Sequence, residues 1–155
     1  MGTATESVSV EREIAIAASP ETVWNLLVDP DQSVLWMGQA ATFDVRPGGG
    51  YRIDVIPGHT ARGEFIEVDP PRRLVHTWGW EAESGSSVPA GSTTIEYELI
   101  PSADGTLLRF SHRDLPSAEA AASHAHGWDH YFERLVLVAA GGDPGPDPWV
   151  EGRMD

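Results

Sequence analysis

The stretch that decides the fold is LLRFSHRDLPSAEAAASHAHGWDHYFERLVLVAA, residues 107–140. It opens with Leu108, Phe110 and His112 at alternate positions, the period of a strand that buries one face. From Ser117 to Ala140 the apolar residues instead recur at helical spacing, on a face made of Trp128, Tyr131, Phe132, Leu135, Val138 and Ala139. The stretch therefore predicts a strand followed by a helix of about six turns, which Gly141-Gly142 ends.

Upstream of this stretch, short alternating segments are separated by turn residues. The first is Val8–Ile16, in which Arg12 interrupts the apolar side. The later inward positions are Phe43 and Val45; Tyr51, Ile53 and Val55; Gly63, Phe65 and Val68; Leu74, His76, Trp78 and Trp80; and Ile95, Tyr97 and Leu99. Turn residues such as Pro57-Gly58 and Asp104-Gly105 give links of hairpin length, which indicate antiparallel neighbours.

Two short helices are expected between the first two strands. Ser19-Pro20-Glu21 has the residues of a helix start, and Asp29-Pro30 should end that helix. A second helix is predicted from Asp31 to about Met37. Its inward residues would be Val34, Leu35 and Trp36.

This order of elements (strand, two helices, six strands, long helix) predicts an α+β fold. In it, a seven-stranded curved antiparallel sheet grips the C-terminal helix, which alone is long enough to cover one face. The bent sheet should leave a cavity at its open end, near the short helices. We expect residues 8–141 to form one domain, preceded by a disordered segment at 1–7. Residues 142–155 form a Pro/Gly-rich tail that need not be ordered, although Trp149 could fold back onto the domain or onto a second copy.

Composition narrows the classes of function. The net charge is -14 and every basic residue is arginine, which argues against binding to nucleic acid or to anionic membranes. Without cysteine, disulfides and thiolate metal sites are excluded. No segment approaches membrane-spanning length and no signal peptide is recognisable, so a cytoplasmic protein is expected.

Four segments resemble a known superfamily. They are SPETVWNLLVDP with a later tryptophan, GEFIEVDPPRRLVHTWGW, TLLRFSHRDLP and HGWDHYFERL. They are similar to the SRPBCC (START/Bet v 1-like) superfamily, in the branch of the C-terminal domain of the activator of Hsp90 ATPase, over roughly residues 8–140. The resemblance implies a helix-grip fold with a cavity for lipids, sterols, hormones or polyketides, and some members are cyclases or aromatases. Co-chaperone members carry an additional N-terminal domain that this sequence lacks, which disfavours Hsp90 activation.

The candidate ligand site is the inward face of the sheet together with the facing helix. Indole rings offer apolar area and an N–H donor, and an imidazole can hydrogen-bond a ligand or transfer a proton. The candidate cavity-lining residues are Trp36, Phe65, His76, Trp78, Trp80, Tyr97, Phe110, His112, Trp128, Phe132 and Leu135. Each could instead fill the core. Arg12 could anchor a ligand carboxylate or reach solvent at a sheet edge.

No metal or cofactor is expected. His126 and His130 share a helix face, as in H-E-x-x-H sites, but Gly127 replaces the glutamate and no third ligand is indicated by spacing. These histidines and His124 should lie at the solvent side or near the cavity mouth. Gly48–Gly50 lacks the lysine and hydroxyl of a phosphate loop.

Three functions stay open. The first is non-catalytic binding or transport of a small hydrophobic or aromatic molecule, with a homodimer left open. The second is a polyketide-cyclase-like or aromatase-like enzyme that uses His76, His112 or Tyr97 for proton transfer. The third is a co-chaperone-like interaction module, which would need an exposed apolar patch that the sequence does not show. We expect binding rather than catalysis.

Overall fold

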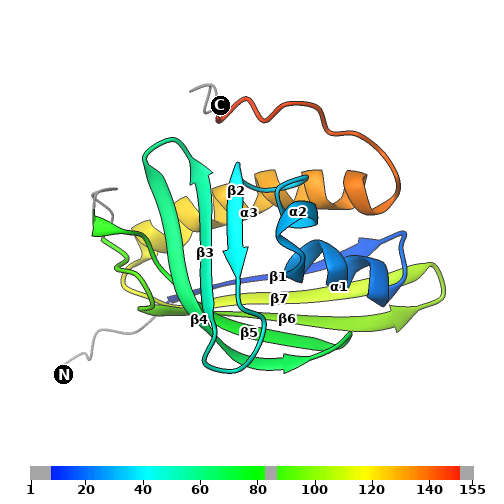
Figure 1. The fold of residues 1–155 in the computed structure, drawn as a ribbon, viewed down its shortest axis with the longest axis horizontal. Helices are drawn as coiled ribbons and strands as arrows, with labels where there is room; N and C mark the ends of the chain where they lie inside the picture. Colours follow the sequence, from blue (N-terminus) through cyan, green and yellow to red (C-terminus); the bar gives the residue numbers. More distant parts are fainter. Residues whose placement is uncertain (1–7, 83–86, 151–155) are drawn as a thin grey trace.

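The computed structural model describes residues 8–82 and 87–150 (Figure 1). The predicted disorder of residues 1–7 and the last part of the predicted tail, residues 151–155, lie outside the described residues. The elements, in chain order, are β1 (Val8–Ile16), α1 (Pro20–Val28), α2 (Pro30–Ser33), β2 (Ala40–Phe43), β3 (Gly50–Ile56), β4 (His59–Asp69), β5 (Arg73–Trp78), β6 (Thr93–Ser102), β7 (Gly105–Leu115) and α3 (Ala118–Ala139).

The strands form one seven-stranded sheet in the order β1-β7-β6-β5-β4-β3-β2, and every neighbouring pair is antiparallel. The sheet bends strongly, so that β2 and β3 stand across the long strands while α3 runs along the inner face (Figure 1). The predicted helix-grip fold is confirmed.

The bend is built into β4. Its first half, up to Glu64, pairs with β3, whereas Phe65 and the residues after it pair with β5, with a register shift between Phe65 and Glu67. Gly63 sits at this corner, where a Cβ atom would collide with the carbonyl oxygen of Thr77. Because the shift interrupts the alternation, Ile66 is half exposed and Val68 is only partly buried. The β3–β4 hairpin therefore bends away from the direction of the long strands, while the residues that follow β5 stay paired with it through bonds from Arg62 N–H to the Gly79 carbonyl and from Glu81 N–H to the Thr60 carbonyl.

The helices α1 and α3 both begin at a serine N-cap, of which the one at Ser19 was predicted. The hydroxyl of Ser19 accepts from the backbone N–H of Thr22, and that of Ser117 accepts from the N–H of Ala120. The expected second helix from Asp31 to Met37 is wrong in its bounds, because α2 covers only Pro30–Ser33.

The chain after α2 continues in turns, with backbone bonds from Leu35 to Gln32 and from Met37 to Ser33, and side chains pin it as well. The Ser33 hydroxyl and the Trp36 indole N–H both donate to the carbonyl of Leu26, at 3.0 and 2.8 Å. This arrangement buries Trp36 but turns Leu35 outward, with 51% of it exposed, so the prediction that Leu35 faces inward is wrong.

The core lies between the inner face of the sheet and α3. The ring of Phe110 on β7 lies 4.8 Å from the rings of both Trp128 and Phe132 on α3. Ile95, Leu108 and Leu135 are fully buried in the same cluster. The predicted inward residues of β3, β5, β6 and β7 are thus buried, as are Trp128, Tyr131, Phe132 and Leu135 of the predicted face of α3. Trp80, Val138 and Ala139 are only partly buried.

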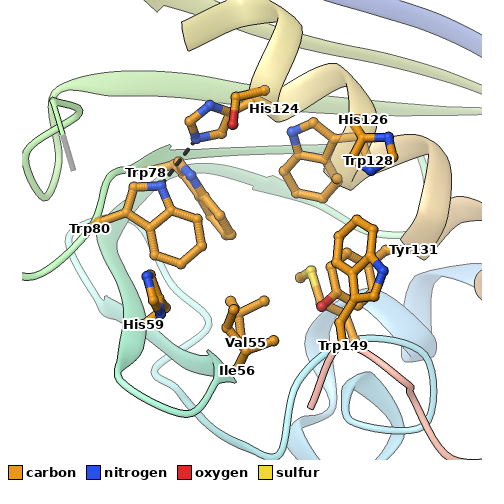
Figure 2. A pocket seen from close by; sticks show the side chains of 13 residues that line it. Val55, Ile56, His59, Trp78, Trp80, His124, His126, Trp128, Tyr131 and Trp149 are labelled. Atoms are coloured by element: carbon orange, nitrogen blue, oxygen red, sulfur yellow. Dashed lines mark hydrogen bonds between the residues drawn. The ribbon is translucent and has the colours of Figure 1, made fainter. Parts of the chain in front are cut away.

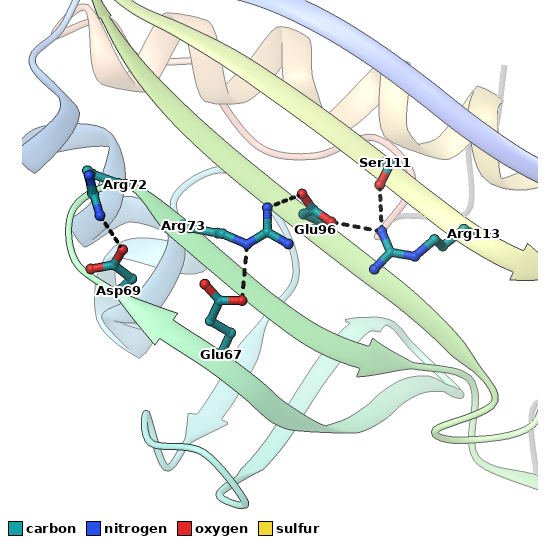
Figure 3. Close-up of polar contacts among 7 residues, drawn as sticks. All are labelled: Glu67, Asp69, Arg72, Arg73, Glu96, Ser111 and Arg113. Carbon is teal, nitrogen blue, oxygen red and sulfur yellow. Dashed lines mark hydrogen bonds and ion pairs between the residues drawn. The ribbon is translucent and has the colours of Figure 1, made fainter.

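The outer face of the sheet carries ion pairs instead. Glu96 on β6 accepts from Arg73 on β5 at 2.6 Å and from Arg113 on β7 at 2.9 Å (Figure 3). Arg73 also reaches Glu67 on β4 at 3.1 Å.

Across the described residues, no helix has the length and apolar character needed to span a membrane.

Candidate functional site

A pocket of about 370 Å³ lies between α3 and the bent end of the sheet, which is formed by the β3–β4 hairpin and the end of β5 (Figure 2). Its walls come from β3, the hairpin turn, the end of β5, α3 and the C-terminal segment. The lining residues are Met37, Val55, Ile56, His59, Trp78, Trp80, Ser123, His124, His126, Gly127, Trp128, Tyr131 and Trp149. Most of these side chains are aromatic or apolar.

The indole rings stand on different sides of this pocket. Trp78 and Trp80 form one wall, and Trp149 and Tyr131 form the wall facing them (Figure 2). Trp128 closes the pocket from α3, and its ring lies 5.3 Å from that of Trp78. The arrangement leaves a space bounded by aromatic faces, which suits a flat apolar molecule.

His124 holds Trp80 in place. Its Nδ1–H donates to the carbonyl of Ala120 at 2.9 Å, so its Nε2 is free to accept from the Trp80 indole N–H at 3.1 Å (Figure 2). Burial lowers the pKa of His124 below its ordinary value. A neutral imidazole with both nitrogens engaged positions an aromatic wall and has no proton to give to a ligand.

Behind the pocket, His112 is equally committed to structure. Its Nδ1 accepts from the Trp128 indole N–H at 3.0 Å, and its Nε2 lies 2.8 Å from the Thr93 hydroxyl. Burial, followed by the neighbouring His124 and His76, lowers the pKa of His112 to about 2. The residue is therefore neutral and fully hydrogen-bonded, and it does not line the pocket.

The other two candidate proton-transfer groups are also core residues. The His76 ring stacks on Tyr51 at 4.0 Å, and its Nδ1–H donates to the carbonyl of Thr77 at 2.8 Å. Burial lowers the pKa of His76 to about 4 and raises that of Tyr97 well above its ordinary value. Neither side chain lines the pocket, so the enzyme hypothesis loses the three groups on which it was based.

Of the eleven candidate cavity-lining residues, the structure brings Trp78, Trp80 and Trp128 together around the pocket. The other eight lie in the core and do not line it: Trp36, Phe65, His76, Tyr97, Phe110, His112, Phe132 and Leu135. The physical reason is that large rings fill the centre of the sheet. Phe132, for example, stacks between Trp36 and Trp128, so no space remains there.

The pocket also uses residues that the sequence analysis did not select as ligand contacts. Val55 was predicted to face inward, but nothing in the sequence showed that Ile56 and His59 at the hairpin turn would meet α3. The cavity was expected beside the short helices, yet only Met37, which follows α2, contributes from that region. The pocket lies instead between the β3–β4 hairpin, the end of β5 and α3.

Arg12 does face inward from β1, but it is paired. Its guanidinium donates to both carboxylate oxygens of Asp129 on α3, at 2.8 and 3.2 Å. This pair raises the pKa of Arg12 and lowers that of Asp129. Arg12 therefore fastens the helix to the first strand and lies outside the pocket.

The histidines of α3 separate into different roles. His124 and His126 line the pocket, whereas His130 lies next to Asp147, with its Nε2 at 2.9 Å from Oδ1. Within residues 8–82 and 87–150, no three His, Asp or Glu side chains are placed to hold a metal ion.

Comparison with protein families gives one assignment. Residues 17–140 match the model of the family described as activator of Hsp90 ATPase homolog 1-like protein. The chain belongs to this family. The resemblance read from the sequence is thereby confirmed, and the matched residues run from just after β1 to the end of α3.

Solved structures agree with this assignment. An AHSA1-like protein from Rhizobium etli is 48% identical, over 96% of this chain and 92% of that one, with a TM-score of 0.76. CalU16 from Micromonospora echinospora is 24% identical over 96% and 81%, with a TM-score of 0.68. DynU16, a protein of the dynemicin biosynthetic locus, is 21% identical over 88% and 48%, with a TM-score of 0.73. The last two share the fold alone. No curated protein matches the chain.

Proposed function

We propose that this AHSA1-like chain binds a small, flat, apolar or aromatic molecule in the pocket between the β3–β4 hairpin, α3 and the C-terminal segment. The observation that carries the proposal is the set of aromatic walls, Trp78 and Trp80 on one side and Tyr131 and Trp149 on the other (Figure 2). The volume of about 370 Å³ is within the usual range for small-molecule sites.

The binding energy would come mainly from area. Apolar surface removed from water contributes about 25 cal/mol per Å², so burial of roughly 200 Å² of a ligand would contribute about 5 kcal/mol. Ring stacking against indoles adds a smaller directional contribution. A flat aromatic ligand gains both contributions, whereas a branched aliphatic one gains only the first.

Polar groups in the pocket wall further define the ligand. The indole N–H of Trp78 is buried without a hydrogen-bond partner among the described residues, although buried donors are normally paired. A water molecule or a ligand oxygen next to this N–H would satisfy it. Among the described residues that line the pocket there is no Asp or Glu. Because the described part of the pocket wall presents no carboxylate, we expect a neutral or anionic ligand.

Binding is better supported than catalysis. His124 is neutral with both ring nitrogens engaged, and His76, His112 and Tyr97 lie behind the pocket wall. The positioned acid or base that a cyclase needs is therefore not among these groups.

The test is a fluorescence titration with Nile red, a flat neutral dye, together with two matched variants. Ile56 lines the pocket, whereas Ile66 lies on the outside of β4 and is 50% exposed. Ile56→Trp should fill the pocket and weaken Nile red binding about tenfold or more, while Ile66→Trp should leave it unchanged. Absence of saturable binding to the native chain, or equal affinity in both variants, would refute the proposal.

A further inference from the structure

The C-terminal segment folds back along α3, with residues 143–150 running beside the helix that precedes them (Figure 1). It is held by three α3 residues at four-residue spacing, His126, His130 and Arg134, which share one face of the helix. This face therefore serves as a docking surface for the segment, which we call the C-terminal arm.

Each contact of the arm is specific. The Trp149 ring stacks on His130 at 3.9 Å with the planes 10° apart. The Asp147 carboxylate accepts from the Trp149 backbone N–H at 3.0 Å and lies 2.9 Å from His130 Nε2. Arg134 donates to the carbonyl of Gly145 at 2.9 Å. Together these contacts leave Trp149 only 7% exposed, with its side chain forming part of the pocket wall.

The sequence of the arm combines flexible glycines with conformationally restricted prolines. Gly141 has a φ of 90°, a left-handed conformation that favours glycine, and the helix ends there with bonds from Gly141 and Gly142 to the last turn. Prolines then occupy positions 144, 146 and 148, each with a fixed φ angle. Gly145, with a φ of 72°, lies between the first two prolines, so rotation can occur at Gly141, Gly142 and Gly145, and residues 146–149 would move together.

We propose that the C-terminal arm is a lid on the pocket and that Trp149 is the residue that controls ligand entry and release. This inference rests on the proposed function. Within residues 143–150 the arm forms no strand or helix. The docking surface of His126, His130 and Arg134 on α3 is therefore what keeps the lid closed. When the arm swings out, the pocket loses the wall opposite Trp78 and Trp80 and opens beside Tyr131 (Figure 2).

A lid and a fixed wall differ in kinetics. Removing a fixed wall raises only the dissociation rate, because the bound state alone loses contacts. Removing a lid raises the association rate as well, because the closed state no longer blocks entry. Stopped-flow mixing with Nile red should therefore give faster association and faster dissociation for Trp149→Ala than for the native chain.

Asp147→Ala separates lid motion from loss of pocket surface, because Asp147 anchors the arm and does not line the pocket. We expect both Nile red rate constants to rise about tenfold, the effect of losing one hydrogen-bonded anchor. Asp104→Ala, in the exposed β6–β7 turn, removes the same charge and should change neither rate. Association rates that stay native in Trp149→Ala and Asp147→Ala would overturn the lid.

A second measurement does not depend on the dye. Because the chain has no cysteine, Val150→Cys places one thiol on the arm. Adding Asp147→Ala should speed its reaction with a disulfide reagent about tenfold, and Nile red should slow the reaction of the single variant. Equal thiol reaction rates in the two variants would overturn the lid even if Nile red binds. Failure of Nile red to bind the native chain, with unequal thiol rates, would instead refute the proposed function alone.

Discussion

The indole N–H of Trp128 donates to Nδ1 of His112 at 3.0 Å, and this bond ties α3 to the centre of the sheet. Because Nδ1 accepts, the proton of the neutral imidazole is on Nε2, which donates to the Thr93 hydroxyl at 2.8 Å. Thr93 in turn donates to the carbonyl of Trp78 at 2.7 Å. One chain of hydrogen bonds thus runs from α3 through β7 and β6 to the strand that carries the pocket wall.

Two substitutions of Trp128 should separate its area from its hydrogen bond. Trp128→Ala should lower the free energy of unfolding by about 3–5 kcal/mol, the range for a large buried aromatic. Trp128→Phe keeps most of the area but leaves His112 Nδ1 unpaired, and it should cost about 1–3 kcal/mol. Urea denaturation measures both. Leu137→Ala, at an exposed position of α3, is the control, and a loss equal to that of Trp128→Ala would contradict the docking role.

The buried imidazoles should make stability depend on pH. Burial lowers the pKa of His76 to about 4 and that of His112 to about 2, whereas both titrate near 6.5 when unfolded. Below pH 6.5 the unfolded chain therefore takes up protons that the folded chain does not. The free energy of unfolding should fall as the pH drops from 6.5 toward 4, by up to about 1.4 kcal/mol per pH unit for each imidazole.

A variant identifies the groups responsible for this dependence. The phenylalanine of His76→Phe cannot titrate. Between pH 6.5 and 4.5 the free energy of unfolding of this variant should therefore fall less steeply than that of the native chain, by up to about 1.4 kcal/mol per pH unit. Urea denaturation at several pH values measures the slope. Equal stability of the native chain at pH 7 and pH 5 would show that these imidazoles are not buried as neutral groups.

The Glu96 carboxylate bridge on the outer face of the sheet should contribute more to the free energy of unfolding than an isolated surface ion pair does. Glu96 joins Arg73 and Arg113 across three strands and is largely covered, whereas the pair of Asp69 and Arg72 is local and exposed (Figure 3). Glu96→Ala should cost about 1 kcal/mol of unfolding free energy, less in high salt, and Asp69→Ala no more than about 0.5 kcal/mol. Thermal unfolding at low and high salt measures both, and equal costs would contradict a cooperative bridge.

The C-terminal arm should be dispensable for the fold but not for stability. Deleting residues 143–155 leaves the end of α3 intact, because Gly141 and Gly142 already close the helix. Loss of the buried Trp149 ring should still lower the free energy of unfolding by about 1.5–3 kcal/mol. Circular dichroism checks that the secondary structure is kept. An unchanged denaturation midpoint would mean that Trp149 does not pack on α3 in solution.

The fold could be predicted from the sequence because each signal was local and repeated. Alternation marked the inner faces of the strands, and the change of period after His112 marked α3, which the structure places at Ala118–Ala139. The predicted cap at Ser19 fixed the start of α1. The second helix was wrong in its bounds, because regular helix ends at Ser33 and turns follow. The bonds from Ser33 and Trp36 to the carbonyl of Leu26 are contacts between segments that periodicity does not record.

The site could be predicted only in part. An inward side chain either fills the core or lines a cavity, and both roles use the same residue types. The sequence therefore did not distinguish the core residues His76 and Phe110 from the pocket residues Trp78 and Trp80. What separates them is the bend of the sheet at Gly63, which decides where space remains between the sheet and α3 and which depends on pairing between distant segments. The position of Trp149 in the pocket wall depends on contacts with α3 side chains such as His130 and Arg134, which the composition of the chain did not reveal.

The central claim, a ligand between aromatic walls at one end of the sheet, is tested most directly by the indole N–H signals in nitrogen-15 NMR spectra. The probe is 2-naphthol, a flat aromatic with one hydroxyl. Trp78 and Trp149 lie on facing walls of the pocket, whereas Trp36 is buried elsewhere with its N–H bonded to Leu26. Titration should shift the indole signals of Trp78 and Trp149 and leave that of Trp36 in place. Absence of any shift at high 2-naphthol concentration, or a Trp36 shift as large as that of Trp78, would contradict the account.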